Sequence, residues 1–275
     1  KLIRLLSSFL TERNILVRVG GSRSRQVKLC AGTPQGSVLS PTLFSVFVND
    51  IPLRQNSMLD AGTFADDTTL WASAATKKTA ISQLQISLRQ LEPWLSTWRI
   101  KVNAKKTQFI CFGAKTSDGK IKLCGEEIKE GKTLKFLGTT FDKALSAKPH
   151  CKEIASRAMS RVHLLRRLRG QTWGTSGPRL LMFYKQFIRP VLENGHSYSA
   201  TGKPTALNKL RAVQNAAMRT ILQAPPRSRI ADMEKKTGLP DLQLRLTDLK
   251  TAAHQRYQGS SLMELLGIRT SLLTA

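Results

Sequence analysis

The stretch TFADDTTLWA, Thr63 to Ala72, places two adjacent aspartates between residues of high β-propensity. This pattern predicts a β-hairpin over residues 58–73, with Asp66 and Asp67 at or near its tip. Adjacent carboxylates repel each other, and a divalent cation such as Mg²⁺ relieves the repulsion by taking carboxylate oxygens as ligands. Taken alone, the pair is more typical of an exposed turn, in which Asp is simply a good turn former.

Helices and strands surround this hairpin up to about Asp142, and the mixture predicts an α+β fold. Ser40 is expected to cap a helix that has Pro41 at its first position, and Pro93 is expected to kink or divide the longest helix. Hydrophobic spacing predicts helices over 1–10 and 76–100, strands over 15–19, 26–30, 107–112 and 133–141, and a short hairpin over 120–130.

The formal net charge is +26, with 44 Lys and Arg against 18 Asp and Glu. A polyanion usually neutralises such an excess, so nucleic acid is the first candidate partner, an anionic membrane surface the second and a ribosomal-type structural role the third. No apolar run approaches the ~20 residues of a membrane span, and no signal peptide is visible. The four cysteines form no Cys-x-x-Cys pair, which argues against zinc and suits a reducing compartment.

The basic charge is concentrated in the second half of the chain. Helical patterns separated by Gly- and Pro-containing breaks are expected over 150–169, 178–192 and 205–222. Between residues 146 and 223 only Glu153 and Glu193 oppose the basic residues, which are Lys148, Lys152, Arg157, Arg161, Arg166, Arg167, Arg169, Arg179, Lys185, Arg189, Lys203, Lys209, Arg211 and Arg219. We therefore expect a basic, all-helical unit, followed by a linker at 224–229 and a helical tail.

Two further segments are compatible with phosphate chemistry. In GTPQGS, Gly32 to Ser37, the glycines allow a ligand to approach the backbone, and the segment leads into a helix N-terminus that attracts phosphate. In KVNAKKTQF, Lys101, Lys105 and Lys106 precede a predicted strand, and a lysine near a transferred phosphate neutralises charge or donates a proton. Taken separately, the first segment is equally an ordinary loop and the second a solvated basic helix end.

The order of these motifs is more specific than any one of them. AGTPQGSVLSPTLFSVFVNDIP, FADD, NAKKT and LKFLGTTFD together resemble the reverse transcriptases of non-LTR retrotransposons, in particular the jockey-like group. The resemblance runs to about residue 222, and LRAVQNAAMRTILQAP and GLPDL resemble the segment after the polymerase. It implies a right-hand fold with partial fingers and palm over 1–144, a basic helical thumb over 145–222, and a linker and helical post-polymerase segment over 223–275.

The resemblance implies an RNA-directed DNA polymerase, a nucleotidyltransferase that uses dNTPs, an RNA template and a DNA primer. Asp66, Asp67 and Lys106 would be its catalytic residues, and the two aspartates would bind two Mg²⁺ or Mn²⁺ ions in the intact enzyme. The resemblance assigns Gly32, Pro34, Gln35, Gly36, Phe64 and Ala65 to template and nucleotide, Phe136, Leu137 and Gly138 to the primer, and Arg157, Arg161, Arg166, Arg167 and Arg169 to the backbone of the RNA/DNA hybrid.

One departure from the family pattern bears on activity. The family uses a further Asp upstream of the glycine loop, and Glu12 is the sole acidic residue before Gly32. With two of three carboxylates a metal site would be under-ligated, so we expect this chain to be a piece of a longer protein and inactive alone. The alternative is a non-catalytic remnant that only binds hybrid duplex. Both interpretations predict a protein of the nucleus and cytoplasm that is neither secreted nor membrane-bound.

Overall fold

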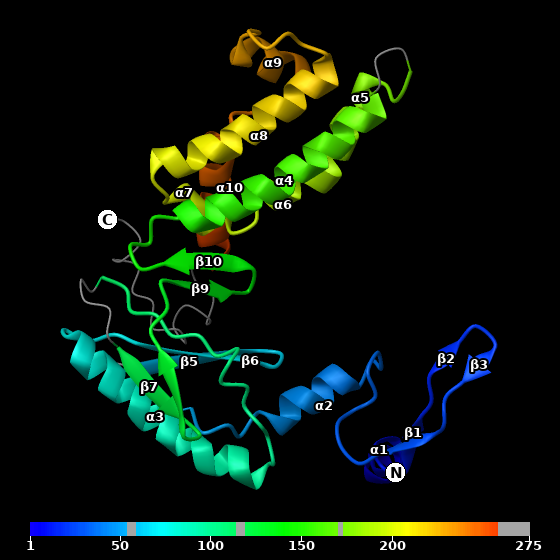
Figure 1. Ribbon diagram of the computed structural model, residues 1–275, viewed down its shortest axis with the longest axis vertical. Helices are drawn as coiled ribbons and strands as arrows, with labels where there is room; N and C mark the ends of the chain where they lie inside the picture. Colours follow the sequence, from blue (N-terminus) through cyan, green and yellow to red (C-terminus); the bar gives the residue numbers. More distant parts are fainter. Residues whose placement is uncertain (54–58, 114–118, 170–172, 258–275) are drawn as a thin grey trace. The chain divides into compact units, whose positions relative to one another are not determined.

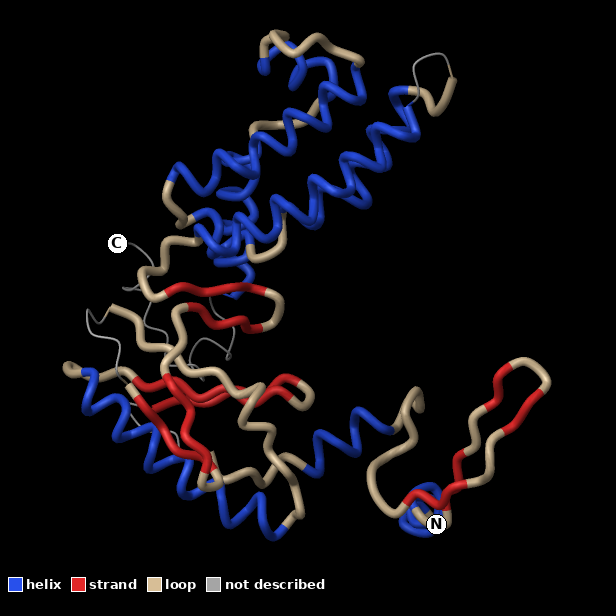
Figure 2. Tube along the Cα trace, in the orientation of Figure 1, coloured by secondary structure: helices blue, strands red, loops and turns tan. Residues whose placement is uncertain are grey.

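The computed structural model describes residues 1–53, 59–113, 119–169 and 173–257. The chain divides into two compact units, Lys1–Val102 and the residues from Asn103 onward (Figure 1). The sheets among the described residues are two-stranded and antiparallel, and helices predominate in the second unit (Figure 2). This mixture confirms the predicted α+β class. None of the described helices is both long enough and apolar enough to cross a membrane.

The first unit combines β-hairpins with helices. Its elements are α1 (Leu2–Leu10), β1 (Arg13–Ile15), β2 (Arg18–Val19), β3 (Ser22–Arg23), β4 (Val27–Leu29), α2 (Ser40–Phe47), β5 (Leu59–Phe64), β6 (Asp67–Ala72) and α3 (Lys77–Thr97). Strand β1 pairs with β4, and β2 pairs with β3, so residues 13–29 form one interrupted hairpin. Its tip is Gly20-Gly21, between the segments 15–19 and 26–30 that are predicted as strands, and residues 16–17 interrupt the first of them.

The core of the first unit lies between α3 and the β5–β6 hairpin, since α3 packs against β6. Leu88, Leu91 and Leu95 recur on one face of α3 and are buried, as are Leu59 and Ala61 on β5. The helical spacing of the leucines and the two-residue period of the strand therefore bring apolar side chains together. This packing fixes the base of the hairpin that carries the two aspartates.

The structure differs from the expected cap at Ser40 and from a division of the longest helix at Pro93. Helix α2 begins at Ser40 with Leu39 as its N-cap, and the Ser40 hydroxyl donates 2.5 Å to the backbone oxygen of Pro34 instead of capping the helix. Pro93 lies inside α3 without dividing it. The carbonyl of Arg89, which loses its helical donor to the proline, belongs to an exposed residue, so water can replace the missing hydrogen bond.

The second unit consists of two hairpins followed by packed helices. Its elements are β7 (Lys120–Leu123), β8 (Glu126–Lys129), β9 (Thr133–Phe136), β10 (Thr139–Asp142), α4 (Lys148–Arg169), α5 (Gly177–Phe183), the π-helical turn η1 (Tyr184–Ile188), α6 (Arg189–Leu192), α7 (His196–Ala200), α8 (Pro204–Leu222), α9 (Ile230–Thr237) and α10 (Leu242–Tyr257). The predicted hairpin over 120–130 and the predicted helices over 150–169, 178–192 and 205–222 are confirmed, the second of these with a π-helical turn.

Two strand predictions in this unit need correction. Residues 133–141, predicted as one strand, form the hairpin β9–β10. Residues 107–112, predicted as a strand, contain only an isolated bridge between Phe109 and Glu130. Their β-propensity is not matched by a pairing partner along the rest of the segment, and a strand needs such a partner to satisfy its backbone groups.

One hydrophobic core joins the helices of the second unit. Helices α4 and α8 pack along one another (Figure 1) and bury, among others, Ile154, Val162 and Leu210. Leu242 and Leu246 of α10 belong to the same core. The described part of the predicted segment 223–275 therefore packs against α7 and α8 and joins the same core. Its last residues, 258–275, lie outside the described residues.

Candidate nucleic-acid and metal-binding site

Asp66 and Asp67 lie at the tip of the β5–β6 hairpin, as predicted. Phe64 pairs with Asp67, so Ala65 and Asp66 form the two-residue turn. Ala65 has a φ of 50°, in the left-handed region that costs a residue with a Cβ about 1–3 kcal/mol. Strain of this kind is concentrated at functional sites. Met58, where the predicted hairpin begins, lies outside the described residues.

The β5–β6 hairpin has one buried and one exposed face. Leu59 and Ala61 lie on the buried face, whereas the cross-strand pair Phe64 and Asp67 lies on the other. Phe64 is 63% exposed, and Asp66 and Asp67 are both exposed. The carboxylates therefore keep their hydration, which offsets their mutual repulsion, and a ligand can reach them from solvent.

The donor chemistry of this tip fits a hard divalent cation. Carboxylate oxygens are the ligands that Mg²⁺ and Mn²⁺ prefer, and Asp66 and Asp67 supply two such groups in adjacent positions. Within residues 1–53, 59–113, 119–169 and 173–257, no three His, Cys, Asp or Glu side chains are grouped so that they could hold a metal ion. The pair is therefore chemically compatible with a divalent cation, and it offers two carboxylates.

The loop before α2 owes its shape to two glycines. Gly32 and Gly36 have φ values of 83° and 84°, which a residue with a side chain rarely adopts. A Cβ at either position would meet open space, so the backbone conformation, and not crowding, requires glycine there. Gln35 between them is exposed, and the backbone oxygen of Pro34 is fixed by the Ser40 hydroxyl. The loop thus presents its backbone to solvent in a defined conformation.

Arg13 holds this loop from β1, and the sequence pattern did not reveal it. Its Nη2 donates to the backbone oxygen of Ala31 at 3.2 Å and to that of Gly32. Its Nε donates to the backbone oxygen of Leu10 at 3.0 Å. Because Arg13 and Ala31 are 18 positions apart, no local pattern identifies the pair. Arg13 is therefore a positioning residue for the start of the glycine loop.

Lys106 lies in a turn that Asn103 organises. The Lys106 backbone N–H donates to the backbone oxygen of Asn103 at 3.0 Å and lies 3.3 Å from the Oδ1 of the same residue. The Thr107 hydroxyl donates to the same backbone oxygen at 3.1 Å. This Asx-type turn fixes the backbone of the NAKKT motif and leaves Lys106 exposed.

Leu137 and Gly138 form the two-residue turn between β9 and β10. Their φ values are 45° and 80°, as a type I′ hairpin turn requires. Gly138 tolerates this conformation, whereas Leu137 is strained. Leu137 is 48% exposed, so the strain is not compensated by burial of its side chain. The turn therefore presents an apolar side chain to solvent.

Glu153 of α4 anchors the β9–β10 hairpin to the helices. Its carboxylate accepts hydrogen bonds from Lys135 Nζ at 2.7 Å, from the Thr140 hydroxyl at 2.8 Å and from Arg157 at 2.9 Å. These bonds, with that of Lys135 the largest contribution, lower the pKa of Glu153 to about 2. The carboxylate is therefore ionised at neutral pH and joins strands β9 and β10 to α4.

The five arginines predicted to contact nucleic acid differ in their surroundings. Three donate to the protein itself: Arg157 to the Glu153 carboxylate, Arg161 to the backbone oxygen of Phe187, and Arg169 to the backbone oxygen of Thr175. Arg166 and Arg167 are exposed, and among the described residues their guanidinium groups make no hydrogen bond or ion pair with protein. These two are the arginines of the set whose guanidinium groups make no such bond among the described residues.

The predicted site residues fall into the two units. The glycine loop and the aspartate pair belong to the first unit, where no hydrogen bond or ion pair links them among the residues described. Lys106, the β9–β10 turn and the arginines belong to the second. Within the second unit the structure joins the β9–β10 hairpin to α4 through Glu153 and through His150.

Comparison with known proteins gives concordant matches. Residues 1–141 match the family described as reverse transcriptase (RNA-dependent DNA polymerase). The chain is 32% identical over 250 residues to the RNA-directed DNA polymerase from mobile element jockey of Drosophila melanogaster, covering 88% of this chain and 27% of that protein. It is 34% identical over 232 residues to the probable RNA-directed DNA polymerase from transposon BS of the same species, covering 80% and 25%. The chain therefore spans about a quarter of these relatives.

Proposed function

Since the chain belongs to the reverse transcriptase (RNA-dependent DNA polymerase) family, we propose a role for it in such an enzyme. It would contribute part of the palm and the thumb of an RNA-directed DNA polymerase of a jockey-like retrotransposon. The observation that carries this proposal is the β5–β6 hairpin. It places Asp66 and Asp67 at an exposed, strained tip within the segment that matches the family.

Asp66 and Asp67 are proposed to hold divalent ions, Mg²⁺ or Mn²⁺, with Asp66 as the main ligand. Two such ions, when bound, activate an attacking hydroxyl and stabilise a leaving phosphate. The exposure of both carboxylates supports this role, because substrate phosphates must reach the same ions. Lys106 is proposed to neutralise charge on the triphosphate, and its exposure on a fixed turn supports that assignment.

The remaining residues are proposed to contact the template, the nucleotide and the primer. The defined backbone of the glycine loop supports contact of Gly32, Pro34, Gln35 and Gly36 with template and nucleotide, together with Phe64 and Ala65 beside the aspartates. The tight turn at Leu137 and Gly138, which Phe136 precedes, supports contact with the primer end. On this proposal residues 1–144 are partial fingers and palm, 145–222 the thumb and 223–275 the post-polymerase segment, in a protein of the nucleus and cytoplasm.

The second candidate function is binding of RNA/DNA hybrid without catalysis. It is favoured by the net charge of +26, because phosphate contacts need basic side chains and no catalytic carboxylates. Both candidates predict hybrid binding, and they differ in the fate of a primer. Because this chain supplies two of the three carboxylates that the family uses, we expect no primer extension by the purified chain with Mg²⁺, primer–template and dNTPs. Clear extension would refute this expectation.

The aspartate site itself is tested by binding of Mn²⁺ alone, measured from the free-ion signal in electron paramagnetic resonance. The Asp66→Asn variant is expected to lose the weak Mn²⁺ binding of the wild-type chain, because the amide carries no charge. The matched control is Asp232→Asn, which removes an exposed carboxylate on α9 and should leave binding unchanged. Equal Mn²⁺ binding by wild type and Asp66→Asn would contradict the proposal.

A further inference from the structure

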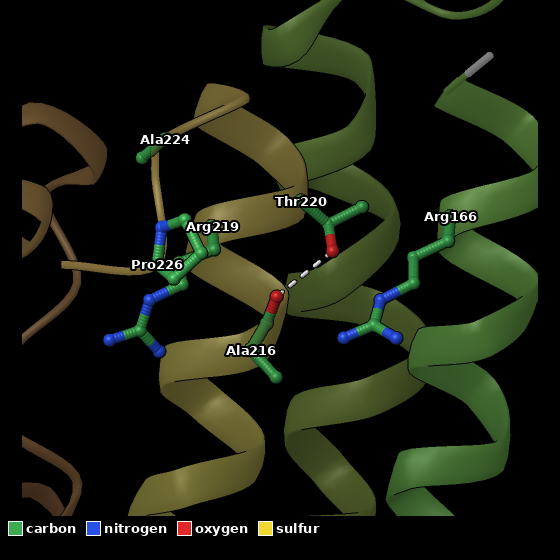
Figure 3. Close-up of a pocket in the computed structure, with 6 residues that line it drawn as sticks. All are labelled: Arg166, Ala216, Arg219, Thr220, Ala224 and Pro226. Carbon is green, nitrogen blue, oxygen red and sulfur yellow. Dashed lines mark hydrogen bonds between the residues drawn. The ribbon is translucent and has the colours of Figure 1, made fainter. Parts of the chain in front are cut away.

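An open pocket of about 540 Å³ lies where the C-terminal parts of α4 and α8 meet the loop after α8 (Figure 3). Its lining residues are Arg166 from α4, Ala216, Arg219 and Thr220 from α8, and Ala224 and Pro226 from the loop. Figure 3 shows the two arginines on either side of Ala216 and Thr220. The pocket therefore has a floor of small residues with a guanidinium group at each edge.

Both guanidinium groups of the pocket lack a counter-ion in the part of the chain that the structure describes. Among the described residues, no Asp or Glu forms an ion pair with Arg166 or Arg219, and the Nε of Arg219 is buried without a hydrogen-bond partner. The Thr220 hydroxyl donates to the backbone oxygen of Ala216 at 2.9 Å, so its proton is already used (Figure 3). Like charges facing one hollow repel each other, and a bound anion relieves that repulsion.

We propose that this pocket binds the sugar–phosphate backbone of a nucleic-acid strand, with Arg166 and Arg219 as its two phosphate ligands. The inference rests on the proposed function, because it takes the ligand to be the nucleic acid that the polymerase holds. It adds Arg219, which the sequence reading left out of the candidate site. It also separates Arg166 from Arg157, Arg161 and Arg169, whose guanidinium groups already donate within the protein.

The shape and chemistry of the pocket select this ligand class. A guanidinium group presents a planar fork of donors that matches two oxygens of a phosphate. The small side chains of Ala216 and Ala224 let a strand approach the helix closely, and the hollow has more room than a single phosphate needs. With a guanidinium group at each edge, the pocket offers two positions for phosphates of one strand.

The test measures binding of a fluorescein-labelled RNA/DNA hybrid to the full chain across a range of salt concentrations. The variant Arg166→Gln with Arg219→Gln is compared with Lys152→Gln and Arg179→Gln, an exposed pair on α4 and α5 whose loss removes the same charge. We expect the pocket variant to bind at least ~10-fold more weakly at physiological salt, with a salt slope lower by about 2, since each phosphate contact contributes about 0.9. The control pair should change the slope by well under 1.

The outcomes separate the inference from the proposed function. If the wild type binds hybrid and the pocket variant matches the control pair, the inference is overturned and the proposed function stands. If the wild type binds no hybrid, both are overturned. If inorganic phosphate or a dNTP competes fully at constant ionic strength, the pocket takes a free anion and the inference of a strand is overturned. Unchanged circular dichroism and thermal midpoint verify that the variants fold, and Arg166→Lys with Arg219→Lys should restore part of the binding because it keeps the charge.

Discussion

The imidazole of His150 is completely buried, and its Nε2 lies 3.0 Å from the backbone oxygen of Asn194. Its Nδ1 accepts the backbone N–H of Thr140 at 3.4 Å. Because a carbonyl oxygen can only accept, the ring proton must be on Nε2, and the neutral tautomer satisfies both contacts. One side chain near the start of α4 thus connects β10 with the segment between α6 and α7.

Replacement of Gly195 by alanine should disrupt this connection. A Cβ at Gly195 would lie 2.6 Å from His150 Nε2, and the residue has a φ of 64°. Gly238 has the same φ, but a Cβ there would meet open space. We expect Gly195→Ala to lower the free energy of unfolding by about 1–3 kcal/mol more than Gly238→Ala, since only the former crowds its neighbours. Urea denaturation measures both, and equal losses would show that His150 accommodates the methyl group freely.

The helical unit should become less stable in acid, because the Glu153 carboxylate is then protonated. The pKa of this carboxyl is about 2 in the folded chain, against a usual value of 4.5, so its contribution is fully present above pH 4.5 and is lost as the pH falls towards 2. After allowance for solvent screening, we expect Glu153→Gln to cost about 1 kcal/mol at pH 6 and less at pH 3. Chemical denaturation at the two pH values measures this, with exposed Glu126→Gln as control. A cost for Glu153→Gln that does not change with pH would contradict the assignment.

The buried hydroxyl of Tyr184 should stabilise the fold through its hydrogen bond to Gln214. It donates to Gln214 Oε1 at 2.8 Å, and the Gln214 amide in turn donates to the backbone oxygen of Pro240 at 2.9 Å. Burial raises the pKa of Tyr184, so the hydroxyl stays protonated and available as a donor. Tyr184→Phe should cost about 1–3 kcal/mol because it leaves the Gln214 oxygen unsatisfied. In a double-mutant cycle with Gln214→Leu the two losses should be less than additive, and strict additivity would exclude the coupling.

The cysteines should differ in reactivity towards a maleimide. Cys30 and Cys124 are exposed, whereas Cys151 is buried in the core of the helical unit. Burial raises the pKa of the Cys151 thiol, so less of the reactive thiolate is present. Mass spectrometry of the native chain should find Cys30 and Cys124 modified well before Cys151, and all of them modified in denaturant. Labelling of native Cys151 as fast as Cys30 would show that the core opens readily.

The motif order predicted the family, and the matches to reverse transcriptases confirm it. The aspartate hairpin was predictable because β-prone residues flank a two-residue turn. The turn at Leu137 was implied by the family resemblance alone, because leucine seldom occupies a left-handed conformation and the residue pattern is that of a continuous strand. Ser40 has the right residue type for a cap, but a contact with Pro34 takes its hydroxyl.

The contacts that hold the candidate site residues join positions far apart in the chain. Arg13 with Ala31, His150 with Asn194, and Arg166 with Arg219 in one pocket are set by tertiary packing. A single sequence contains no local signal for such pairs, whereas periodicity and turn chemistry are local. The residue types of the site are therefore readable in advance, and the residues that position them become visible only in the fold.

Residues of α4 and α10 belong to one core, and the ribosome makes the two helices at different times. Ile154 and Leu246 belong to one hydrophobic core, so the apolar face of α4 leaves the ribosome before that core can be completed. At typical elongation rates of roughly 5–20 residues per second, that interval lasts on the order of 5–20 s. A nascent chain interrupted between the two helices would expose a basic, apolar surface to the RNA around it.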